Sequence, residues 1–292
     1  MTEPSYCRAN DLGLIRVAGR DARQFLHAQT TQSLIDLPAN GTRLAAWLTA
    51  KGRVRALFDV VAEDDTLWLV TEAESADWLT AEMARFVLRS DVRLEVVNDR
   101  AVYSLLGDSN RWLRDRGIGL APRAAAAALG ALWFRMAPGR IDVVADPDTL
   151  EPELAGLATA NPDAAALAAI QAGRPAVPAV LRERYIPQML NLERLDAVSF
   201  TKGCYPGQEI VARTQNLGEV KRRLARFRCG PGPRPEPAAP IVDQASQDAG
   251  EINRAAATDD GYELLAVTRI DAAGTELALA SDGRTLQPLP LL

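Results

Sequence analysis

The chain has 292 residues, and its formal net charge of −5 argues against a protein that coats nucleic acid or an anionic membrane surface. Hydrophobic residues make up 48% of the sequence and charged residues 24%, which is typical of a globular protein and excludes global disorder. The length predicts two or three compact units with a sizeable core.

Residues that build metal sites and disulfides are scarce. The three cysteines, Cys7, Cys204 and Cys229, lie far apart and form no C-x-x-C pair, so we expect neither a disulfide framework nor a stably bound metal. His27 is the one histidine, which excludes a multi-histidine metal site. The sequence shows no apolar run of about 20 residues and no signal-peptide pattern at its start, so we expect a cytoplasmic protein without a membrane partner.

The first third of the chain mixes helix and strand signals. Asp21 followed by Gln24 resembles a capping box, which predicts a helix that starts near Ala22. The β-rich runs at 53–63 and 66–73 are separated by a short polar turn, which predicts an antiparallel pair.

Further helices and strands are expected downstream of this pair. Ser75 precedes a segment with apolar residues at helical spacing, and the alternating run at 92–98 predicts a strand. The helical face comprises Leu79, Met83, Phe86 and Val87. The alanine-rich segment 123–133 favours a helix by propensity. A helix with Asn161 as N-cap, Pro162 in its first turn and Gly173 as its stop follows.

The last 120 residues combine an irregular stretch with a strand-rich tail. Segment 174–200 contains prolines and no clear period, which predicts a long ordered loop. The tail has strand-like runs at 224–229, 262–270 and 275–281, as expected for a small antiparallel barrel. We therefore predict an α+β fold, with a body at 1–218 and a small β-barrel at 219–292.

The segment TKGCYPGQE, residues 201–209, places a cysteine in a glycine-rich turn. Pro206 and Gly207 suit the centre of a type II turn, and apolar spacing after them predicts a short helix. Cys204 would then precede a helix N-terminus and lie near Lys202, and both favour a thiolate. By local sequence alone, a small buried cysteine beside a tight turn is the commoner fate of a free cysteine.

The segment SFTKGCYPGQEIVAR resembles the K-G-C-Y-x-G-Q-E signature of the YgfZ family, and segments 19–34, 51–61 and 170–200 resemble other parts of that family in the same order. The family's members are folate-binding relatives of the glycine-cleavage aminomethyltransferase that support iron-sulfur enzymes. The resemblance implies a ring of two interleaved α+β subdomains plus the barrel, with a central tetrahydrofolate site that the signature cysteine faces.

The resemblance also implies roles for individual residues. Cys204 and Lys202 correspond to the family's functional cysteine and lysine, and a tentative folate site follows from the remaining matches. It comprises Lys51, Arg53, Tyr205, Gln208 and Glu209. Where the aminomethyltransferases carry a catalytic aspartate, this chain has Ala56 and Leu57, with Asp59 further along an expected strand. Aminomethyl transfer would thereby lose its main electrostatic aid.

Three functions follow as hypotheses. The first is a folate-dependent accessory protein for the assembly, maintenance or repair of [4Fe–4S] enzymes, such as radical tRNA-modifying enzymes, in which Cys204 is redox-active or contacts a cluster transiently. The second is a folate-dependent one-carbon transferase. The third is a thiol enzyme that pairs Cys204 with His27, although an isolated histidine is more often a packing residue. A basic cluster near the signature comprises Lys221, Arg222, Arg223, Arg226 and Arg228. In an acidic chain it is expected to be a solvated strand face, with no direct nucleic-acid contact.

Overall fold

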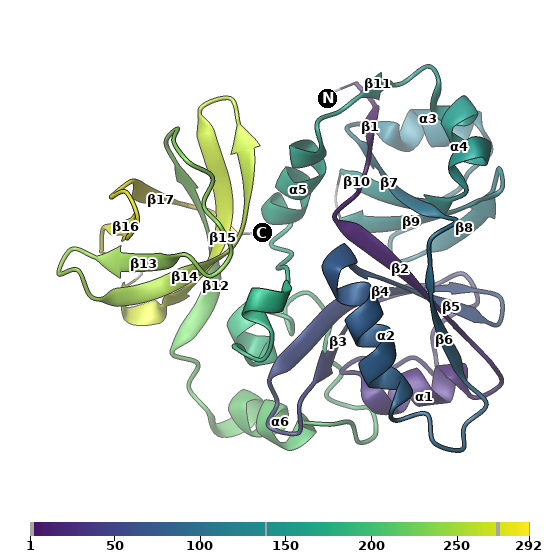
Figure 1. Cartoon of the computed structure of the whole chain (residues 1–292), viewed down its shortest axis with the longest axis horizontal. Coiled ribbons are helices and arrows are strands. Elements are labelled where there is room, and N and C mark those ends of the chain that lie inside the picture. Colours follow the sequence, from purple (N-terminus) through teal and green to yellow (C-terminus); the bar gives the residue numbers. More distant parts are fainter. Residues whose placement is uncertain (1–2, 138, 273–274, 292) are drawn as a thin grey trace.

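The computed structural model describes residues 3–137, 139–272 and 275–291, which form two β-sheets with flanking helices and a closed β-barrel (Figure 1). The five-stranded sheet has the order β3-β4-β5-β2-β6. Its strands are β2 (Leu12–Ala18), β3 (Thr42–Leu48), β4 (Val54–Glu63), β5 (Thr66–Glu72) and β6 (Arg93–Val97). Two helices, α1 (Ala22–Gln29) and α2 (Ala76–Ala84), pack on it through Phe25, Leu26, Leu79 and Met83.

The second sheet has six strands in the order β11-β1-β7-β10-β9-β8. These are β1 (Ser5–Arg8), β7 (Ala101–Leu106), β8 (Ala125–Ala128), β9 (Ala131–Ala137), β10 (Arg140–Ala145) and β11 (Ala158–Thr159). The helices that follow its strands are α3 (Ser109–Asp115), α4 (Pro147–Leu154) and α5 (Pro162–Gln171). Because the chain starts here in β1, builds the other sheet and then returns, the two α+β subdomains are interleaved, as predicted.

The C-terminal strands close into an antiparallel barrel in the order β12-β15-β14-β13-β16-β17. They are β12 (Arg222–Cys229), β13 (Pro240–Asp243), β14 (Asp248–Thr258), β15 (Gly261–Arg269), β16 (Leu277–Leu279) and β17 (Thr285–Leu289). Closure pairs β12 with both β15 and β17, which removes exposed strand edges. The predicted barrel is confirmed, whereas the exact division between residues 218 and 219 stays a prediction.

The expected helix in the alanine-rich segment is wrong, because this segment forms a β-hairpin. Strands β8 and β9 pair through Ala128 and Ala131, and the two residues between them, Leu129 and Gly130, have φ of 54° and 69°. Positive φ at both central positions is the requirement of a type I′ turn. The fully buried Trp133 and the pairing of β9 with β10 outweigh the weak helix preference of alanine.

Two helix termini also differ from expectation. The carboxylate of Asp21 does not cap α1 and instead accepts a hydrogen bond of 2.8 Å from the backbone N–H of Asp91. Helix α2 ends at Ala84, so Phe86 lies beyond it. The Phe86 ring meets Trp47 edge-on, with 6.0 Å between ring centroids. In both cases a contact that is distant in sequence replaces the local pattern.

The elements nearest the signature match the predictions made from the sequence. Helix α5 begins with Asn161, whose side chain accepts from the N–H of Asp163 at 3.0 Å, and lies between the barrel and the six-stranded sheet (Figure 1). The segment 174–200 contains only short 3-10 turns at Ala179–Leu181 and Pro187–Leu190, as predicted. Helix α6 (Gln208–Leu217) follows the signature turn and leads into the barrel.

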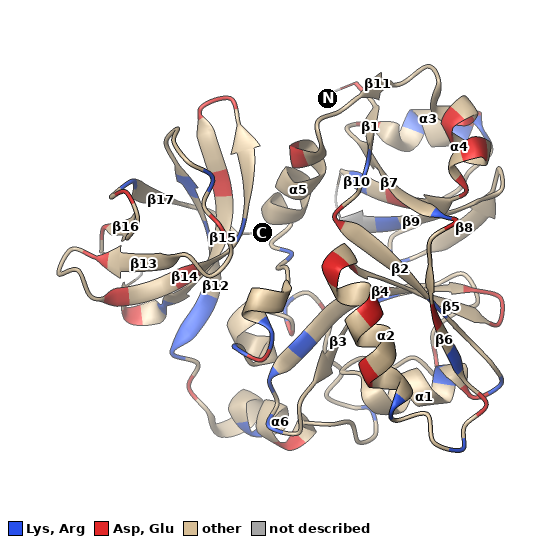
Figure 2. Cartoon of the chain, viewed as in Figure 1, with Lys and Arg blue, Asp and Glu red and all other residues tan. Residues whose placement is uncertain are grey.

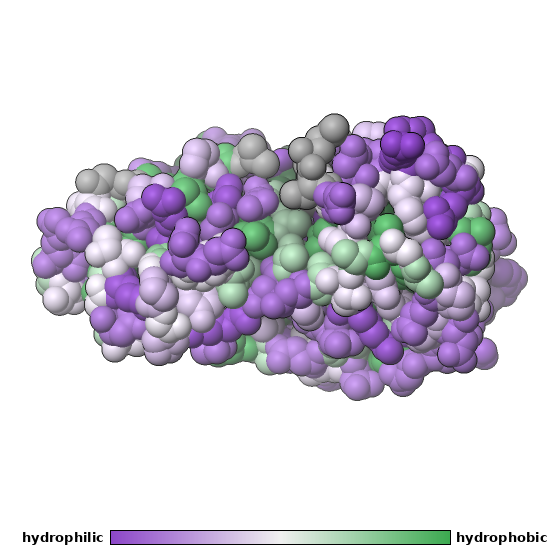
Figure 3. All heavy atoms as spheres, turned by 90° about the horizontal axis from the view of Figure 1, so that it is seen from above, coloured by the Kyte–Doolittle hydropathy of each residue, from purple (hydrophilic) through white to green (hydrophobic). Residues whose placement is uncertain are grey.

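Charged and apolar side chains are dispersed over the molecule. Figure 2 shows basic and acidic segments intermingled in both sheets and in the barrel. Seen from above, the molecule has apolar atoms in the seam between the barrel and the two-sheet body (Figure 3). No helix among the described residues is long and apolar enough to cross a membrane.

Candidate functional site around Cys204

The signature turn has the predicted geometry. Gly207 has φ of 81° and ψ of 0°, the values of the third residue of a type II turn, and the N–H of Gln208 donates to the carbonyl of Tyr205 at 3.2 Å. Gly207 is also the residue from which α6 starts. The turn therefore places Cys204 directly ahead of the first turn of a helix.

The tip of the β3–β4 hairpin packs against this turn. A Cβ atom on Gly207 would lie 2.5 Å from the carbonyl oxygen of Thr49 and 2.7 Å from the Cα of Gly52. Only glycine allows this approach of two backbones. The contact brings Lys51 and Arg53, which flank Gly52, next to the signature although they are about 150 residues away in sequence.

The two cations of the hairpin tip differ in their surroundings. Lys51 is exposed, whereas Arg53 is half-buried and donates through Nη1 to the carbonyl of Arg184 at 2.7 Å. Arg53 therefore ties the hairpin tip to the long irregular segment. Lys51 remains the more accessible cation for an anionic ligand.

Among the side chains of the signature, Tyr205 is buried and Cys204 is exposed. Tyr205 is 7% exposed and packs in an apolar cluster with Val54 and Val211, and burial raises the pKa of its phenol to about 12. Cys204, one residue earlier, is exposed. Glu209 is exposed and pairs with Arg213 at 3.3 Å along α6. The turn is thus held by Tyr205 while the thiol faces solvent.

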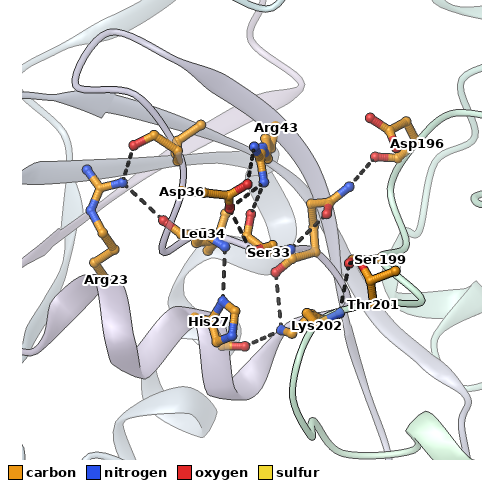
Figure 4. A network of polar contacts seen from close by, with 12 residues as sticks. Arg23, His27, Ser33, Leu34, Asp36, Arg43, Asp196, Ser199, Thr201 and Lys202 are labelled. Carbon is orange, nitrogen blue, oxygen red and sulfur yellow. Dashed lines mark hydrogen bonds and ion pairs between the residues drawn. The ribbon is translucent and has the colours of Figure 1, made fainter.

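Lys202 fixes the start of the signature to α1. Its ammonium donates to the carbonyls of His27, Thr30 and Gln32, the last two at 2.6 and 3.2 Å (Figure 4). These carbonyls lie at and just beyond the C-terminus of α1, where the helix dipole favours a cation. Burial lowers the pKa of Lys202 to about 8. Its three donors are therefore directed at backbone oxygens.

His27 lies on the same helix end. Its Nδ1 accepts a hydrogen bond of 3.1 Å from the backbone N–H of Leu34 (Figure 4). Burial, reinforced by the charge of Lys202, lowers the imidazole pKa. Because Nδ1 accepts this hydrogen bond, a neutral ring carries its proton on Nε2. Among the described residues no hydrogen bond joins His27 to Cys204, and the ring serves as a packing and loop-holding group.

A cavity of about 680 Å³ lies where the two subdomains and the barrel meet. The connection before β2, the end of β5, the start of α5 and strand β14 all contribute to it. Its polar residues include Asp11, Glu72, Asp163, Arg234, Asn253 and Arg254. None of Lys51, Arg53, Tyr205, Gln208 or Glu209 is among its lining residues, so their assignment to a folate site stays a prediction.

Arg254 is the functional candidate in this cavity that sequence reasoning missed. Its Nε is buried without a hydrogen-bond partner, and within the part of the chain that the structure describes its guanidinium forms no ion pair. Burial lowers its pKa and raises the pKa of the Glu72 carboxyl across the same cavity. The register of β14 shifts between Ile252 and Arg254, and such a bulge re-aims side chains. The feature of the sequence that points to Arg254 is the polar pair Asn253-Arg254 inside a strand.

Asp59 is the carboxylate nearest the position of the aminomethyltransferase aspartate. It is buried in β4, where its two oxygens accept from both terminal nitrogens of Arg174. Burial raises its pKa to about 6, opposed by the charge of Arg174. Ala56 and Leu57 are themselves buried, at 1% and 6% exposure. The departure noted in the sequence therefore stands, since no carboxylate occupies these two positions.

The basic cluster after α6 is largely neutralised by acidic partners. Ion pairs join Arg222 to Asp248 at 2.7 Å and Arg226 to Glu263 at 2.5 Å. Arg223 pairs with Glu193 at 2.7 Å. On this strand face, three of the five cations are therefore paired with carboxylates. Among the described residues, no group of three or more His, Cys, Asp or Glu side chains is placed to hold a metal ion.

Comparison with known proteins places this geometry in a family. No protein-family model matches the chain. The tRNA-modifying protein YgfZ of Cronobacter sakazakii is 30% identical over 270 residues, which cover 88% of this chain and 82% of the relative. The protein of the same name from Sodalis glossinidius is 27% identical over 96% of this chain and 90% of its own length.

A solved structure supports the fold. The glycine cleavage system aminomethyltransferase T from Bartonella henselae superposes with a TM-score of 0.81, covering 100% of this chain and 86% of that chain at 16% identity. At this identity the match establishes the fold alone. With the sequence relatives and the signature, it leads to one conclusion: the chain belongs to the YgfZ family and has an aminomethyltransferase-like fold.

Proposed function

We propose that this protein binds tetrahydrofolate and supports [4Fe–4S] enzymes that modify tRNA, with Cys204 as the thiol that contacts the client. The observation that carries the proposal is the exposed Cys204 on a firmly held turn. Tyr205 anchors the turn in the core, Gly207 abuts the β3–β4 hairpin, and Lys202 ties it to α1. A packing cysteine would be buried, as Cys7 and Cys229 are.

The relatives support the link to tRNA modification, because those from Cronobacter and Sodalis are named as tRNA-modifying proteins. An iron-sulfur cluster normally takes about four protein ligands. The other two cysteines are buried in β1 and β12, so any cluster contact through Cys204 is shared with the client protein. We expect the client enzyme to bring the cluster.

Loss of the protein tests this part of the proposal. In cells that lack it, the activity of a radical [4Fe–4S] tRNA-modifying enzyme should fall, and expression of the wild-type chain should restore it. An activity that stays at the wild-type level without the protein would contradict the role in supporting such enzymes.

We place tetrahydrofolate in the cavity of about 680 Å³ at the junction of the three units, a volume within the usual range for small-molecule pockets. The unpartnered Arg254 suits a folate carboxylate, since an arginine fork binds carboxylates bidentately. Glu72 offers carboxylate acceptors for the amino and ring N–H groups of a pterin.

Folate binding distinguishes this cavity from the signature turn. Calorimetric titration of tetrahydrofolate should show binding that Arg254→Gln weakens about tenfold or more, the expected loss of a charge-assisted hydrogen bond. Lys51→Gln, which changes the exposed cation beside the signature, is the matched variant. If Lys51→Gln weakens binding and Arg254→Gln does not, folate binds at the signature turn instead. If the wild type does not bind, the folate part of the proposal is wrong.

One-carbon transfer is the alternative that these residues favour less. The buried apolar side chains of Ala56 and Leu57 supply no carboxylate to steer a folate amine, and Asp59 is held by Arg174. Incubation with tetrahydrofolate and a methylamine donor should therefore yield no methylene-tetrahydrofolate above the uncatalysed level. Turnover at enzyme-like rates would favour the transferase.

A further inference from the structure

Two further cavities lie apart from the cavity at the junction of the two subdomains and the barrel. A cavity of about 160 Å³, here called the inner cavity, and one of about 480 Å³, called the outer cavity, share part of their lining and so adjoin each other; together they are called the depression. The shared residues are Thr42, Arg43, Arg123 and Asp196. Neither cavity has a lining residue in common with the cavity assigned to folate.

The lining of this depression is cationic in a chain of net charge −5. Its charged residues comprise Arg43, Arg123, Arg135, Arg174 and Lys202 against Asp36, Asp59 and Asp196. Positive charges thus exceed negative ones by two. Cations gathered in a concave, partly walled site attract anions more strongly than cations on an open surface.

Three of these arginines already have carboxylate partners. Arg174 is held by Asp59, and Arg123 pairs with Asp196 at 2.5 Å. Arg43 reaches both oxygens of Asp36, at 3.0 and 3.1 Å (Figure 4). These pairs fix the positions of three guanidinium groups around the depression, and each pair uses only part of the five N–H groups of its arginine.

The surplus charge resides on the other two cations. Arg135 donates to neutral acceptors, the Asn110 side chain at 2.9 Å and the Leu120 carbonyl at 3.4 Å, and within the described ranges it forms no ion pair. Lys202 is bound to three backbone carbonyls, which leave its charge uncancelled. Arg135 lines the inner cavity and Lys202 the outer one, so one uncompensated cation serves each part.

Hydroxyl groups complete the donor set. Thr42 lines both cavities, and Ser199 and Thr201 lie beside Lys202 at the outer one (Figure 4). Hydroxyls and guanidinium forks together suit the oxygens of phosphate or carboxylate groups. An inner volume of about 160 Å³ accommodates one such group, and the outer cavity accommodates the next.

From this arrangement we propose that the depression binds a small ligand with at least two anionic groups, one in the inner cavity near Arg135 and Arg174 and one in the outer cavity near Arg43, Arg123 and Lys202. This site is separate from the folate cavity and does not depend on the proposed function. Phosphate and carboxylate groups share the required chemistry, and the test separates them.

Calorimetric titration of the full chain at low ionic strength uses inorganic pyrophosphate as the phosphate probe and citrate as the carboxylate probe. We expect at least one probe to bind, and Arg135→Gln and Arg123→Gln each to weaken binding about tenfold. Arg111→Gln, at an exposed arginine of α3 outside the depression, is the control and should bind as the wild type does. Thermal melting confirms that each variant is folded, and the bound probe should raise the melting temperature of the wild type.

Three results would overturn the proposal. The first is that neither probe binds at millimolar concentration. The second is that Arg111→Gln weakens binding as much as Arg135→Gln, since the attraction would then be nonspecific. The third is displacement of the probe by saturating tetrahydrofolate, because the arginines would then belong to the folate site. Which probe binds tells phosphate from carboxylate.

Discussion

The contact between the signature turn and the β3–β4 hairpin predicts a large effect of Gly207→Ala. A Cβ atom there would lie 2.5 Å from the oxygen of Thr49 and 2.7 Å from the Cα of Gly52, and both are backbone atoms that cannot rotate away. The residue would also keep a left-handed φ of 81°, which alone costs a non-glycine residue about 1–2 kcal/mol. With the displaced backbone, we expect a loss of about 3 kcal/mol in the free energy of unfolding.

Urea denaturation followed by tryptophan fluorescence measures this loss, because all five tryptophans lie in the two-sheet body. Gly203→Ala is the matched control: it lies in the same signature, has no left-handed φ, and its Cβ would meet no atom within 4 Å. We expect the control to stay within about 0.5 kcal/mol of the wild type. If Gly207→Ala is equally mild, the hairpin does not hold the turn.

Three further changes test other parts of the site. Tyr205→Ala should lower the free energy of unfolding by about 3 kcal/mol through lost burial, whereas Tyr205→Phe should cost below about 1.5 kcal/mol; equal effects in urea denaturation would contradict the anchoring role. Lys202→Met should speed amide hydrogen exchange at Gln208, whose N–H donates to the carbonyl of Tyr205 in the signature turn, about tenfold, with Lys221→Met as the control, and unchanged protection would show that the ties to α1 are dispensable. Burial raises the pKa of Asp59 to about 6 from its ordinary 3.8, so the folded state binds this proton more tightly than the unfolded chain. The stabilisation of the folded state by this tighter proton binding is complete below pH 3.8 and is lost as the pH rises through about 6. In denaturation at a series of pH values, Asp59→Asn should therefore gain stability relative to the wild type over this range, and a difference that does not vary with pH would refute it.

Much of the fold could be predicted because local rules and tertiary packing agree there. The Asn161–Pro162 start of α5, the Pro206–Gly207 turn and the β4–β5 pair are each specified by neighbouring residues. The alanine-rich hairpin was missed because its backbone is determined by the burial of Trp133 and by pairing with β10, which propensity does not report.

The candidate site was only partly visible in the sequence for a similar reason. The signature identified Cys204 and Lys202, but the carbonyl partners of Lys202 come from the end of α1 and the residues just beyond it, about 170 residues earlier. Arg254 and Arg135 lie in no sequence motif. They stand out only because, among the described residues, the fold places no carboxylate within ion-pair distance of them. Such compensation of charge is a property of the assembled structure.

The thiol of Cys204 is the group on which the proposed function depends most directly. In cells that lack the protein, the activity of a [4Fe–4S] tRNA-modifying enzyme is measured after expression of the wild type, Cys204→Ser or Cys229→Ala at matched protein levels. Cys229→Ala removes a buried thiol of the barrel and serves as the control. We predict that the wild type and Cys229→Ala restore activity and Cys204→Ser does not. Full restoration by Cys204→Ser would contradict it.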